Sequence, residues 1–189
     1  MDYSPLIEQA LRVAAQAHRR QLRKATDIPY FTHPAAVALI LLQNGFLDDV
    51  ILATALLHDV VEDTDFSLAQ LQAAFPAPIP EYVAALTERK RASDGSMRPW
   101  LERKQESIKH LGNAPLAVRA VALADKLHNL SAMLCDLKAG ASVWDRFNAP
   151  RAQLLWYYRA VAEIAGTSDS RLVRLANQCR QCVCALESP

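Results

Sequence analysis

Polar side chains capable of chemistry follow directly on the apolar run at residues 50–57. This run is apolar on almost every side, which is typical of a helix that crosses a protein core rather than one that lies on its surface. It continues into one imidazole and three carboxylates, those of His58, Asp59, Glu62 and Asp63. At about 100° per residue, these side chains fall within an arc of roughly 140° if one helix continues through them.

A bound cation would explain why so many acids stand at the end of a buried helix. Removing a carboxylate from water costs several kcal/mol unless another group compensates its charge, and a cation is the simplest such group. The alternative is that Val61 is the last core residue and the acids form a solvated helix end. Acids at a helix C-terminus are unfavourable to the helix dipole, but this segment alone leaves both interpretations open.

Other polar residues interrupt apolar helical segments elsewhere in the chain. His33 lies in the first turn of an apolar segment, where by itself it would be an ordinary helix residue. Asp125 and Asn129 are four residues apart and therefore share one face of the segment 115–138. Two imidazoles and two carboxylates form a ligand set that suits manganese, iron or zinc better than calcium. The remaining coordination positions would hold water and a substrate oxygen, so the sequence predicts a hydrolytic metal site.

Nearly all of the chain is predicted to be helical, because it has only five glycines and few alternating apolar and polar runs. Ser4 and Ser67 can cap helices, Thr32 is a candidate cap, and Gly45 ends a helix. We expect helices near residues 5–24, 32–44, 48–65, 68–75, 80–87, 101–111, 116–138, 142–145, 150–165 and 168–186. The expected fold is an all-α bundle of about eight to ten helices, with a mobile loop near residues 88–100.

Length and composition favour a single domain. A chain of 189 residues, 51% of them apolar, can bury one substantial core but is short for two domains of ordinary size. The net charge of +1 gives no basic field, so neither nucleic acid nor a membrane is expected as a partner. The absence of a secretion signal and of an apolar stretch of ~18 residues indicates a cytoplasmic protein with reduced thiols. Cys179, Cys182 and Cys184 lack the further ligands that a zinc site needs.

The four motifs QLRK at 21–24, THP at 32–34, HDVVEDT at 58–64 and LADKLHNL at 123–130 occur in a familiar order and spacing. They closely resemble the HD-domain hydrolases of the RelA/SpoT-homologue group. The resemblance runs from about residue 8 to beyond residue 137 and leaves no room for the synthetase or regulatory domains of the long members. The chain is therefore identified as similar to a stand-alone small alarmone hydrolase, with residues 1–189 forming one HD-type metal-dependent phosphohydrolase domain.

The resemblance implies an activity. In this family the cation is usually manganese, in preference to zinc, iron or magnesium, and the small-molecule substrate is guanosine tetraphosphate or pentaphosphate. Removal of the 3′-pyrophosphate releases GDP or GTP and so ends a stringent-response alarmone signal.

The resemblance also assigns roles to residues of this sequence. The metal ligands would be His33, His58, Asp59 and Asp125. The acid pair beside the attacked phosphorus would be Glu62 and Asp63. Arg23 and Lys24 would meet the base and the phosphates, Tyr30 would line the pocket near the ribose, and Asn129 would contact the nucleotide.

The chain departs from the family pattern at positions that help to frame the base. Ala122 stands where a lysine is common, and Ser131 and Ala132 stand where arginine and then threonine or aspartate tend to occur. An adenosine alarmone or NADPH is therefore an alternative substrate. A non-catalytic nucleotide sensor is an alternative function, although the acid pair argues against it. The sequence leaves the oligomeric state open, a homo-oligomer included.

For several charged side chains and histidines, the positions in the sequence can be interpreted without any role in a metal or substrate site. Arg23 and Lys24 would be an ordinary solvated helix end if the motifs around them are set aside. The simplest interpretation is also solvation for Lys90, Arg91, Arg103 and Lys104. Surface positions or helix packing, rather than metal binding, are expected for His18, His110 and His128.

Overall fold

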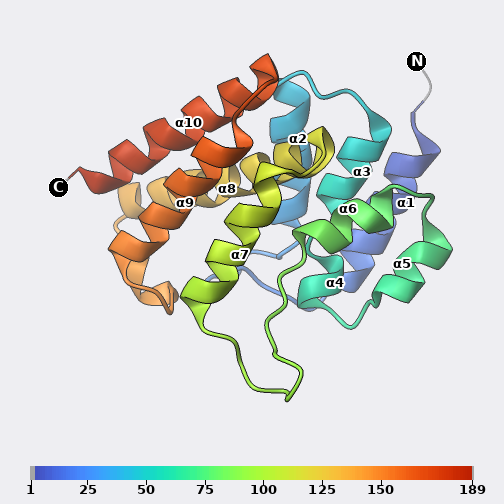
Figure 1. The fold of residues 1–189 in the computed structure, drawn as a ribbon, viewed down its shortest axis with the longest axis horizontal. Helices are drawn as coiled ribbons and strands as arrows, with labels where there is room; N and C mark the ends of the chain where they lie inside the picture. The colour runs from blue at the N-terminus through green and yellow to red at the C-terminus, as the bar shows by residue number, and fades with distance from the viewer. Residues whose placement is uncertain (1–2, 189) are drawn as a thin grey trace.

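Helices cover most of residues 3–188, which are the residues described by the computed structural model (Figure 1). Those residues contain ten α-helices, one 3₁₀-helix and no β-strand, so the all-α prediction is confirmed. The α-helices are α1 (Pro5–Ala17), α2 (Thr32–Gln43), α3 (Asp49–Leu57), α4 (Val60–Asp63), α5 (Leu68–Ala74), α6 (Ile79–Leu86), α7 (Trp100–Gly112), α8 (Leu116–Lys138), α9 (Arg151–Ala165) and α10 (Ser170–Glu187). The 3₁₀-helix η1 (Trp144–Arg146) lies between α8 and α9.

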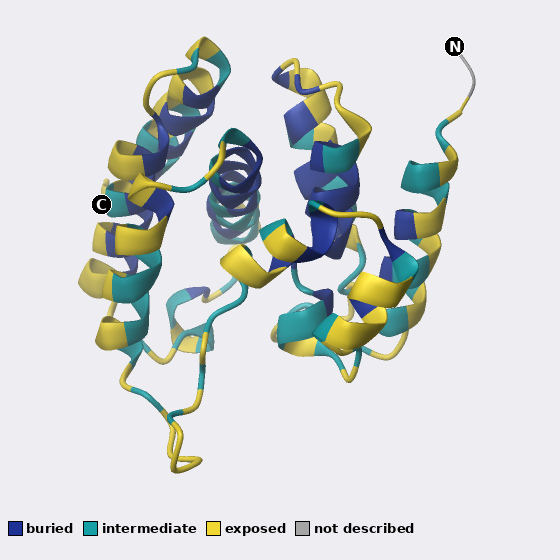
Figure 2. Ribbon diagram, turned by 45° about the vertical axis from the view of Figure 1, so that its right-hand side comes forward, coloured by how far each residue is buried: buried dark blue, intermediate teal, exposed yellow. Residues whose placement is uncertain are grey.

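Two helices, α3 and α8, run through the core and position part of the predicted site. α8 carries Asp125 and Asn129, and α3 ends directly before His58. α3 packs against α1, α2 and α6, while α8 packs against α2, α9 and α10. Every residue from Ile51 to Leu57 is buried, and burial of each leucine among them contributes about 1.5–3 kcal/mol. Figure 2 shows that buried residues gather on the inner helices, whereas the outer helices are exposed along one side. The polar groups at the ends of these helices are therefore anchored by apolar packing.

The helix through residues 48–65 is interrupted, which corrects the prediction of one continuous helix. α3 ends at Leu57, and α4 begins at Val60. Between them Asp59 has φ −98° and ψ −6°, in the sparsely populated region between helix and strand. The helical hydrogen bonding resumes when the Asp63 N–H donates to the Asp59 carbonyl over 2.9 Å. His58 and Asp59 therefore leave the regular helix, and the single 140° arc does not describe the arrangement.

The first helix is shorter than predicted, because α1 ends at Ala17 and residues 18–31 form a closed loop. The loop is held by hydrogen bonds from Arg23 N to Ile28 O and from Tyr30 N to Gln21 O, each 2.8 Å long. The His18 ring closes the helix end, where its Nδ1 lies 2.7 Å from the side-chain oxygen of Gln21. The basic segment is thus part of a turn and not a solvated helix end.

The other helix ends show which of the predicted capping residues do cap a helix. Ser4 and Ser67 cap α1 and α5 as predicted, and Gly45 has the positive φ of +85° that follows α2. Thr32 does not cap α2, because it is already helical and its hydroxyl donates to the Pro29 carbonyl. No helix among residues 3–188 combines the length and the hydrophobicity needed to cross a membrane.

The cap of α3 provides a test of how the site is anchored. The Asp48 carboxylate accepts hydrogen bonds from the N–H groups of Val50 and Ile51, at 2.8 and 3.3 Å. We expect Asp48→Ala to lower the free energy of unfolding by about 1 kcal/mol in chemical denaturation. Asp48→Asn keeps an acceptor and should cost less than half as much. Equal losses in both variants would show that these cap bonds do not stabilise α3.

Candidate metal centre

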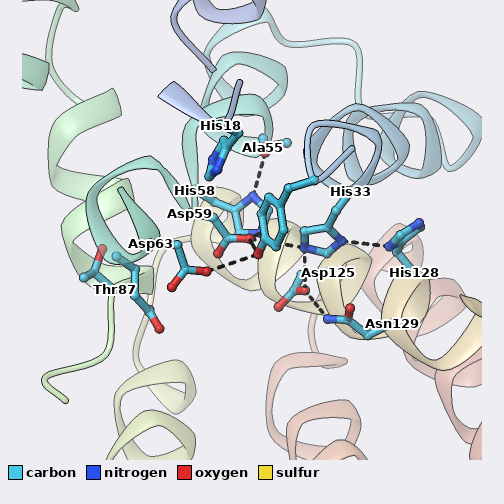
Figure 3. A network of polar contacts seen from close by, with 12 residues as sticks. His18, His33, Ala55, His58, Asp59, Asp63, Thr87, Asp125, His128 and Asn129 are labelled. Atoms are coloured by element: carbon cyan, nitrogen blue, oxygen red, sulfur yellow. Dashed lines mark hydrogen bonds and ion pairs between the residues drawn. The ribbon is translucent and has the colours of Figure 1, made fainter. Parts of the chain in front are cut away.

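Three potential ligands from separate helices meet at one centre. Ligand atoms of His33, His58 and Asp125 all lie within 4.8 Å of one another (Figure 3). A fourth group adjoins them, because Asp59 Oδ2 lies 3.3 Å from His33 Nε2 and 3.2 Å from His58 Nε2. Asp125 Oδ1 lies 3.2 Å from the same His33 nitrogen. The structure thus brings together the four side chains that the sequence predicted as ligands.

Each ligand stands at a position that its helix makes stable. His33 occupies the first turn of α2, His58 directly follows the buried run of α3, and Asp125 lies midway along α8. The α2 helix packs against both α3 and α8, so the three elements are fixed relative to one another. His33 and His58 are almost fully buried, which excludes bulk water from their ring nitrogens.

The protonation of His58 fits a metal ligand. Its Nδ1 lies 2.7 Å from the Ala55 carbonyl, which can only accept, so Nδ1 carries the proton. On a neutral ring Nε2 then has a free lone pair, and this buried atom makes no hydrogen bond within residues 3–188. Its separation of 3.2 Å from Asp59 is a charge contact without hydrogen-bond geometry. A buried nitrogen without a donor, facing two carboxylates and a second imidazole, suits a divalent cation.

The negative charge of the Asp59 and Asp125 carboxylates favours binding of a positive charge at the centre. Burial disfavours the imidazolium, but the Asp59 and Asp125 carboxylates outweigh it and raise the pKa of His58 to about 9. Burial likewise opposes ionisation of Asp59, but His58 and His33 hold the pKa of that carboxyl well below its usual range. The pKa of Asp125 is lowered despite burial, first by Lys126 and then by His33. Two ionised carboxylates therefore face the imidazole nitrogens, and either a proton or a metal ion can satisfy them.

The predicted acid pair separates into two different environments. Glu62 lines the cavity above the ligands, where burial raises the pKa of its carboxyl and the Glu88 N–H donates to it over 2.8 Å. Glu62 also borders an outer hollow, whereas Asp63 borders this hollow but not the cavity. Lys90 contacts both acids, with its Nζ 3.0 Å from Glu62 and 2.7 Å from Asp63. Lys90 is therefore an ion-pair partner and not the purely solvated charge expected from the sequence.

The cavity beside the ligands has a volume of about 190 Å³ and contains cations that the sequence did not single out. Lys104 and Lys126 both line it, and their Nζ atoms lie 4.7 and 5.5 Å from the centre of the Tyr157 ring. Lys104 pairs with Glu88, which corrects its interpretation as a solvated charge. Ala122 also lines the cavity, so these lysines supply positive charge where position 122 supplies none.

Arg23, Tyr30 and Asn129 form one wall of the cavity. The Asn129 side chain donates to Asp125 Oδ1 over 2.6 Å and accepts from Arg23 over 2.8 Å. The Arg23 guanidinium lies 5.5 Å from the centre of the Tyr30 ring. The Tyr30 hydroxyl lies 2.7 Å from Asp59 Oδ2 and 3.2 Å from Asp63 Oδ2, so its one proton is donated to an acid of the centre. Tyr30 therefore supports a predicted ligand directly, a contact that the sequence did not predict.

A second pocket of about 250 Å³ adjoins this wall. Arg23, Tyr30 and Asn129 border both spaces, whereas Lys24 borders only the second one. Apolar side chains, among them Met133 and Phe147, form much of the remaining surface. Ala132 lies here as well, but Ser131 does not. The second pocket thus offers a flat, largely apolar space next to a basic wall.

Two histidines that the sequence placed at the surface or in packing lie against this site. The His18 ring is buried and stacks on Tyr30, with the ring centres 4.8 Å apart. His128 is half-buried, and its Nδ1 lies 2.7 Å from Nδ1 of His33. Burial, followed by the charges of His33 and Arg23, lowers the pKa of His128 to about 4. The position of His128 three residues after Asp125 was the available signal, since residues at this spacing share a helix face.

Comparison with known proteins gives a consistent result. The HD domain family matches residues 10–144 of the chain. Guanosine-3′,5′-bis(diphosphate) 3′-pyrophosphohydrolase MESH1 from Mus musculus and from Homo sapiens is 40% identical to it over 124 residues. The aligned part is 65% of this chain and 66% of each relative, just under two thirds of the relatives' length.

A solved structure resembles the whole arrangement. It is described as a metazoan ortholog of SpoT that hydrolyses ppGpp and plays a role in starvation responses. It superposes with a TM-score of 0.77 at 29% identity and covers 96% of this chain and 97% of its own.

Metal binding can be tested through thermal stability. A ligand that binds only the folded state stabilises it by about 2.7 kcal/mol at a hundredfold excess over its Kd. We expect Mn²⁺ to raise the Tm of the metal-stripped protein and to leave the Tm of His58→Ala nearly unchanged. His110→Ala, in which an exposed histidine of α7 is replaced, is the matched control and should respond like the wild type. An unchanged wild-type Tm with Mn²⁺, Zn²⁺, Fe²⁺ and Mg²⁺ would contradict the metal centre.

Proposed function

We propose, because the chain belongs to the HD domain family, that it is a manganese-dependent hydrolase of hyperphosphorylated guanosine nucleotides. The reaction would remove the 3′-pyrophosphate of guanosine 3′,5′-bis(diphosphate) or of the corresponding pentaphosphate and release GDP or GTP. One observation carries the proposal: two buried imidazoles and two carboxylates meet beneath a cavity that also contains lysine side chains. Relatives and a structural neighbour whose names state this activity support the choice of substrate.

The residues that would hold the cation are His33, His58, Asp59 and Asp125. A divalent cation at these ligands supplies acidification of a water molecule and polarisation of a phosphoryl oxygen near neutral pH. The mixed set of nitrogen and oxygen donors supports manganese over calcium, which prefers oxygen ligands alone.

Glu62 is the group that we assign to proton transfer. It lines the cavity, and burial raises the pKa of its carboxyl toward the range in which a base is effective. The Glu88 N–H and Lys90 hold the carboxylate in place, so its free lone pairs can orient the attacking water. Asp63 would act one step further out, because it borders the outer hollow and not the cavity, although it shares Lys90 with Glu62 and lies 3.2 Å from the Tyr30 hydroxyl.

Positive side chains would bind the phosphate groups. Lys104 and Lys126 lie within the cavity and Arg23 lies on its wall, so they can meet the oxygens of a pyrophosphate whose phosphorus lies at the metal centre. Water would attack this phosphorus and the bond from the phosphorus to the ribose 3′ oxygen would break, so the ribose oxygen leaves with the electron pair and takes up a proton. Fixed cations would stabilise the negative charge on the phosphoryl oxygens during this step. Arg23 also borders the second pocket, where its flat guanidinium could cover one face of a purine.

The second pocket is the proposed place of the nucleoside. Ala132 and Met133 offer no side-chain hydrogen bond to a base edge, so their presence in this pocket supports testing adenosine alarmones and NADPH beside the guanosine compounds. We further propose that residues 1–189 act as a single domain, on both guanosine substrates, in the cytoplasm. The packing of α9 and α10 on α8 supports the single domain, because both helices follow the matched HD segment.

Turnover separates a hydrolase from a sensor. With Mn²⁺, we expect the wild type to convert guanosine 3′,5′-bis(diphosphate) into GDP and pyrophosphate, and Asp59→Ala to be inactive. Glu62→Gln should lower kcat by about 10²–10⁴-fold while Mn²⁺ still raises the Tm of the variant. Glu81→Gln, at an exposed position of α6, is the control and should keep full activity. Tight nucleotide binding without any product across the guanosine and adenosine panel would contradict the hydrolase and favour a sensor.

The pH profile reports on Glu62 and its ion pair. As a base Glu62 must be ionised, so activity should fall as the pH drops through a pKa above its ordinary value of 4.5. Lys90 favours the ionised carboxylate, and its removal in Lys90→Met should raise the pKa of Glu62 further. The acidic limb of kcat against pH should therefore move to higher pH, but not in Lys109→Met, an exposed control on α7. If the acidic limb of the profile does not move in Lys90→Met, a group other than Glu62 determines it.

A further inference from the structure

We propose that His128 is a positioning residue that accepts a hydrogen bond from His33 and so holds the His33 ring ready to bind the metal. This inference rests on the proposed metal-dependent function, because the orientation of His33 matters only if its Nε2 is a ligand. His128 itself would not touch the cation. Its role is to fix both the direction of the neighbouring ring and the position of that ring's proton.

The two rings are arranged for such a hydrogen bond. Nδ1 of His33 and Nδ1 of His128 are 2.7 Å apart, and the ring centres are separated by 4.8 Å at an angle of 48° (Figure 3). His33 belongs to the first turn of α2, and His128 belongs to α8, which packs against α2. One helix therefore supplies both the Asp125 ligand and, one turn later, the group that orients the His33 ligand.

The direction of the hydrogen bond follows from the other nitrogen of His33. Its Nε2 lies 3.3 Å from Asp59 and 3.2 Å from Asp125, so this is the nitrogen that faces the centre. A neutral imidazole that gives the Nε2 lone pair to a metal carries its proton on Nδ1. Two nitrogens at 2.7 Å can share only one proton, so Nδ1 of His128 must be the acceptor. His128 is then neutral, with its own proton on Nε2.

The second imidazole ligand is held in the same way by a different group. Nδ1 of His58 donates to the Ala55 carbonyl over 2.7 Å, which leaves its Nε2 lone pair directed at the centre. The backbone of α3 thus provides the acceptor for one ligand, and the His128 side chain provides it for the other. A carbonyl cannot be removed by substitution, but His128 can, which makes the role testable.

Packing alone is the competing explanation for His128, and two substitutions separate it from the proposed role. Phenylalanine keeps the size and the planarity of the ring but removes the acceptor. Asparagine is smaller, but its Oδ1 occupies nearly the position of Nδ1 and can accept the same hydrogen bond. The acceptor role therefore predicts that His128→Asn binds metal better than His128→Phe, whereas packing alone predicts the opposite order.

The experiment measures Mn²⁺ binding to metal-stripped protein by calorimetry, without nucleotide and without turnover. Loss of a group that orients a metal-bound histidine typically weakens metal affinity by about 10–100-fold, and we expect this for His128→Phe. His128→Asn should stay within about threefold of the wild type. His110→Phe makes the same change at an exposed position and should bind as the wild type does. Equal affinity in His128→Phe and the wild type, or weaker binding by His128→Asn than by His128→Phe, would overturn the inference.

The outcomes distinguish this inference from the proposed function. A wild type that binds no divalent cation would overturn both, whereas a wild type and His128→Phe of equal affinity would overturn only the role of His128. If His128→Phe does not fold, nitrogen NMR of wild-type imidazoles loaded with diamagnetic Zn²⁺ provides a second test. A proton on Nε2 of His128 is expected there, and a proton on its Nδ1 would overturn the inference.

Discussion

The repulsion between two largely shielded carboxylates is the constraint on which the site depends. Asp59 and Asp125 are both held in their ionised form close to the buried His33 ring, with side chains that are 17% and 12% exposed. Such a pair is unstable unless positive charge stands between or beside its members. The protein supplies part of it through Lys126 and through a proton on the His58 imidazole, whose pKa is raised to about 9. A divalent cation would take the place of such a proton, so the same excess of negative charge that is unfavourable for folding favours binding of a cation at this centre.

A second set of charges connects segments that are distant in the chain. Lys90, in the loop that follows α6, reaches back to Glu62 and Asp63 of α4. Glu88 at the start of the same loop pairs with Arg103 over 2.7 Å and with Lys104 of α7. These pairs are partly shielded from solvent, and they place the loop and α7 against the cavity. The same ion pairs that order the loop therefore hold in position Glu62, the proposed base, and Lys104, the lysine proposed to meet the phosphates.

Hydrogen bonds from outside the ligand set then determine how each ligand points. Tyr30 donates to an acid of the centre, and Asn129 links Asp125 to Arg23. The Ala55 carbonyl accepts from His58, while His33 meets His128. Groups of this kind fix the tautomer and the direction of a ligand, and a centre without them would bind a metal loosely. The proposed metal ligands and the cavity wall formed by Arg23, Tyr30 and Asn129 are thus parts of one network of polar contacts.

The sequence by itself determined the helical class and several caps, and the resemblance of its motifs to the HD-domain hydrolases identified the four side chains that meet at the centre. Polar residues such as His33 and Asp125 stand out within apolar helices, because burial of an unpaired polar group costs free energy and such residues are therefore uncommon there. Only the tertiary structure decided the break at Asp59, the closed loop that carries Arg23 and the separate surroundings of Glu62 and Asp63. It also revealed the contacts of His128 with His33 on α2 and of Lys104 with Glu88 in the loop after α6. Hydrogen-bond direction and ion pairing depend on distances between elements far apart in the chain, and helical periodicity carries no information about those distances.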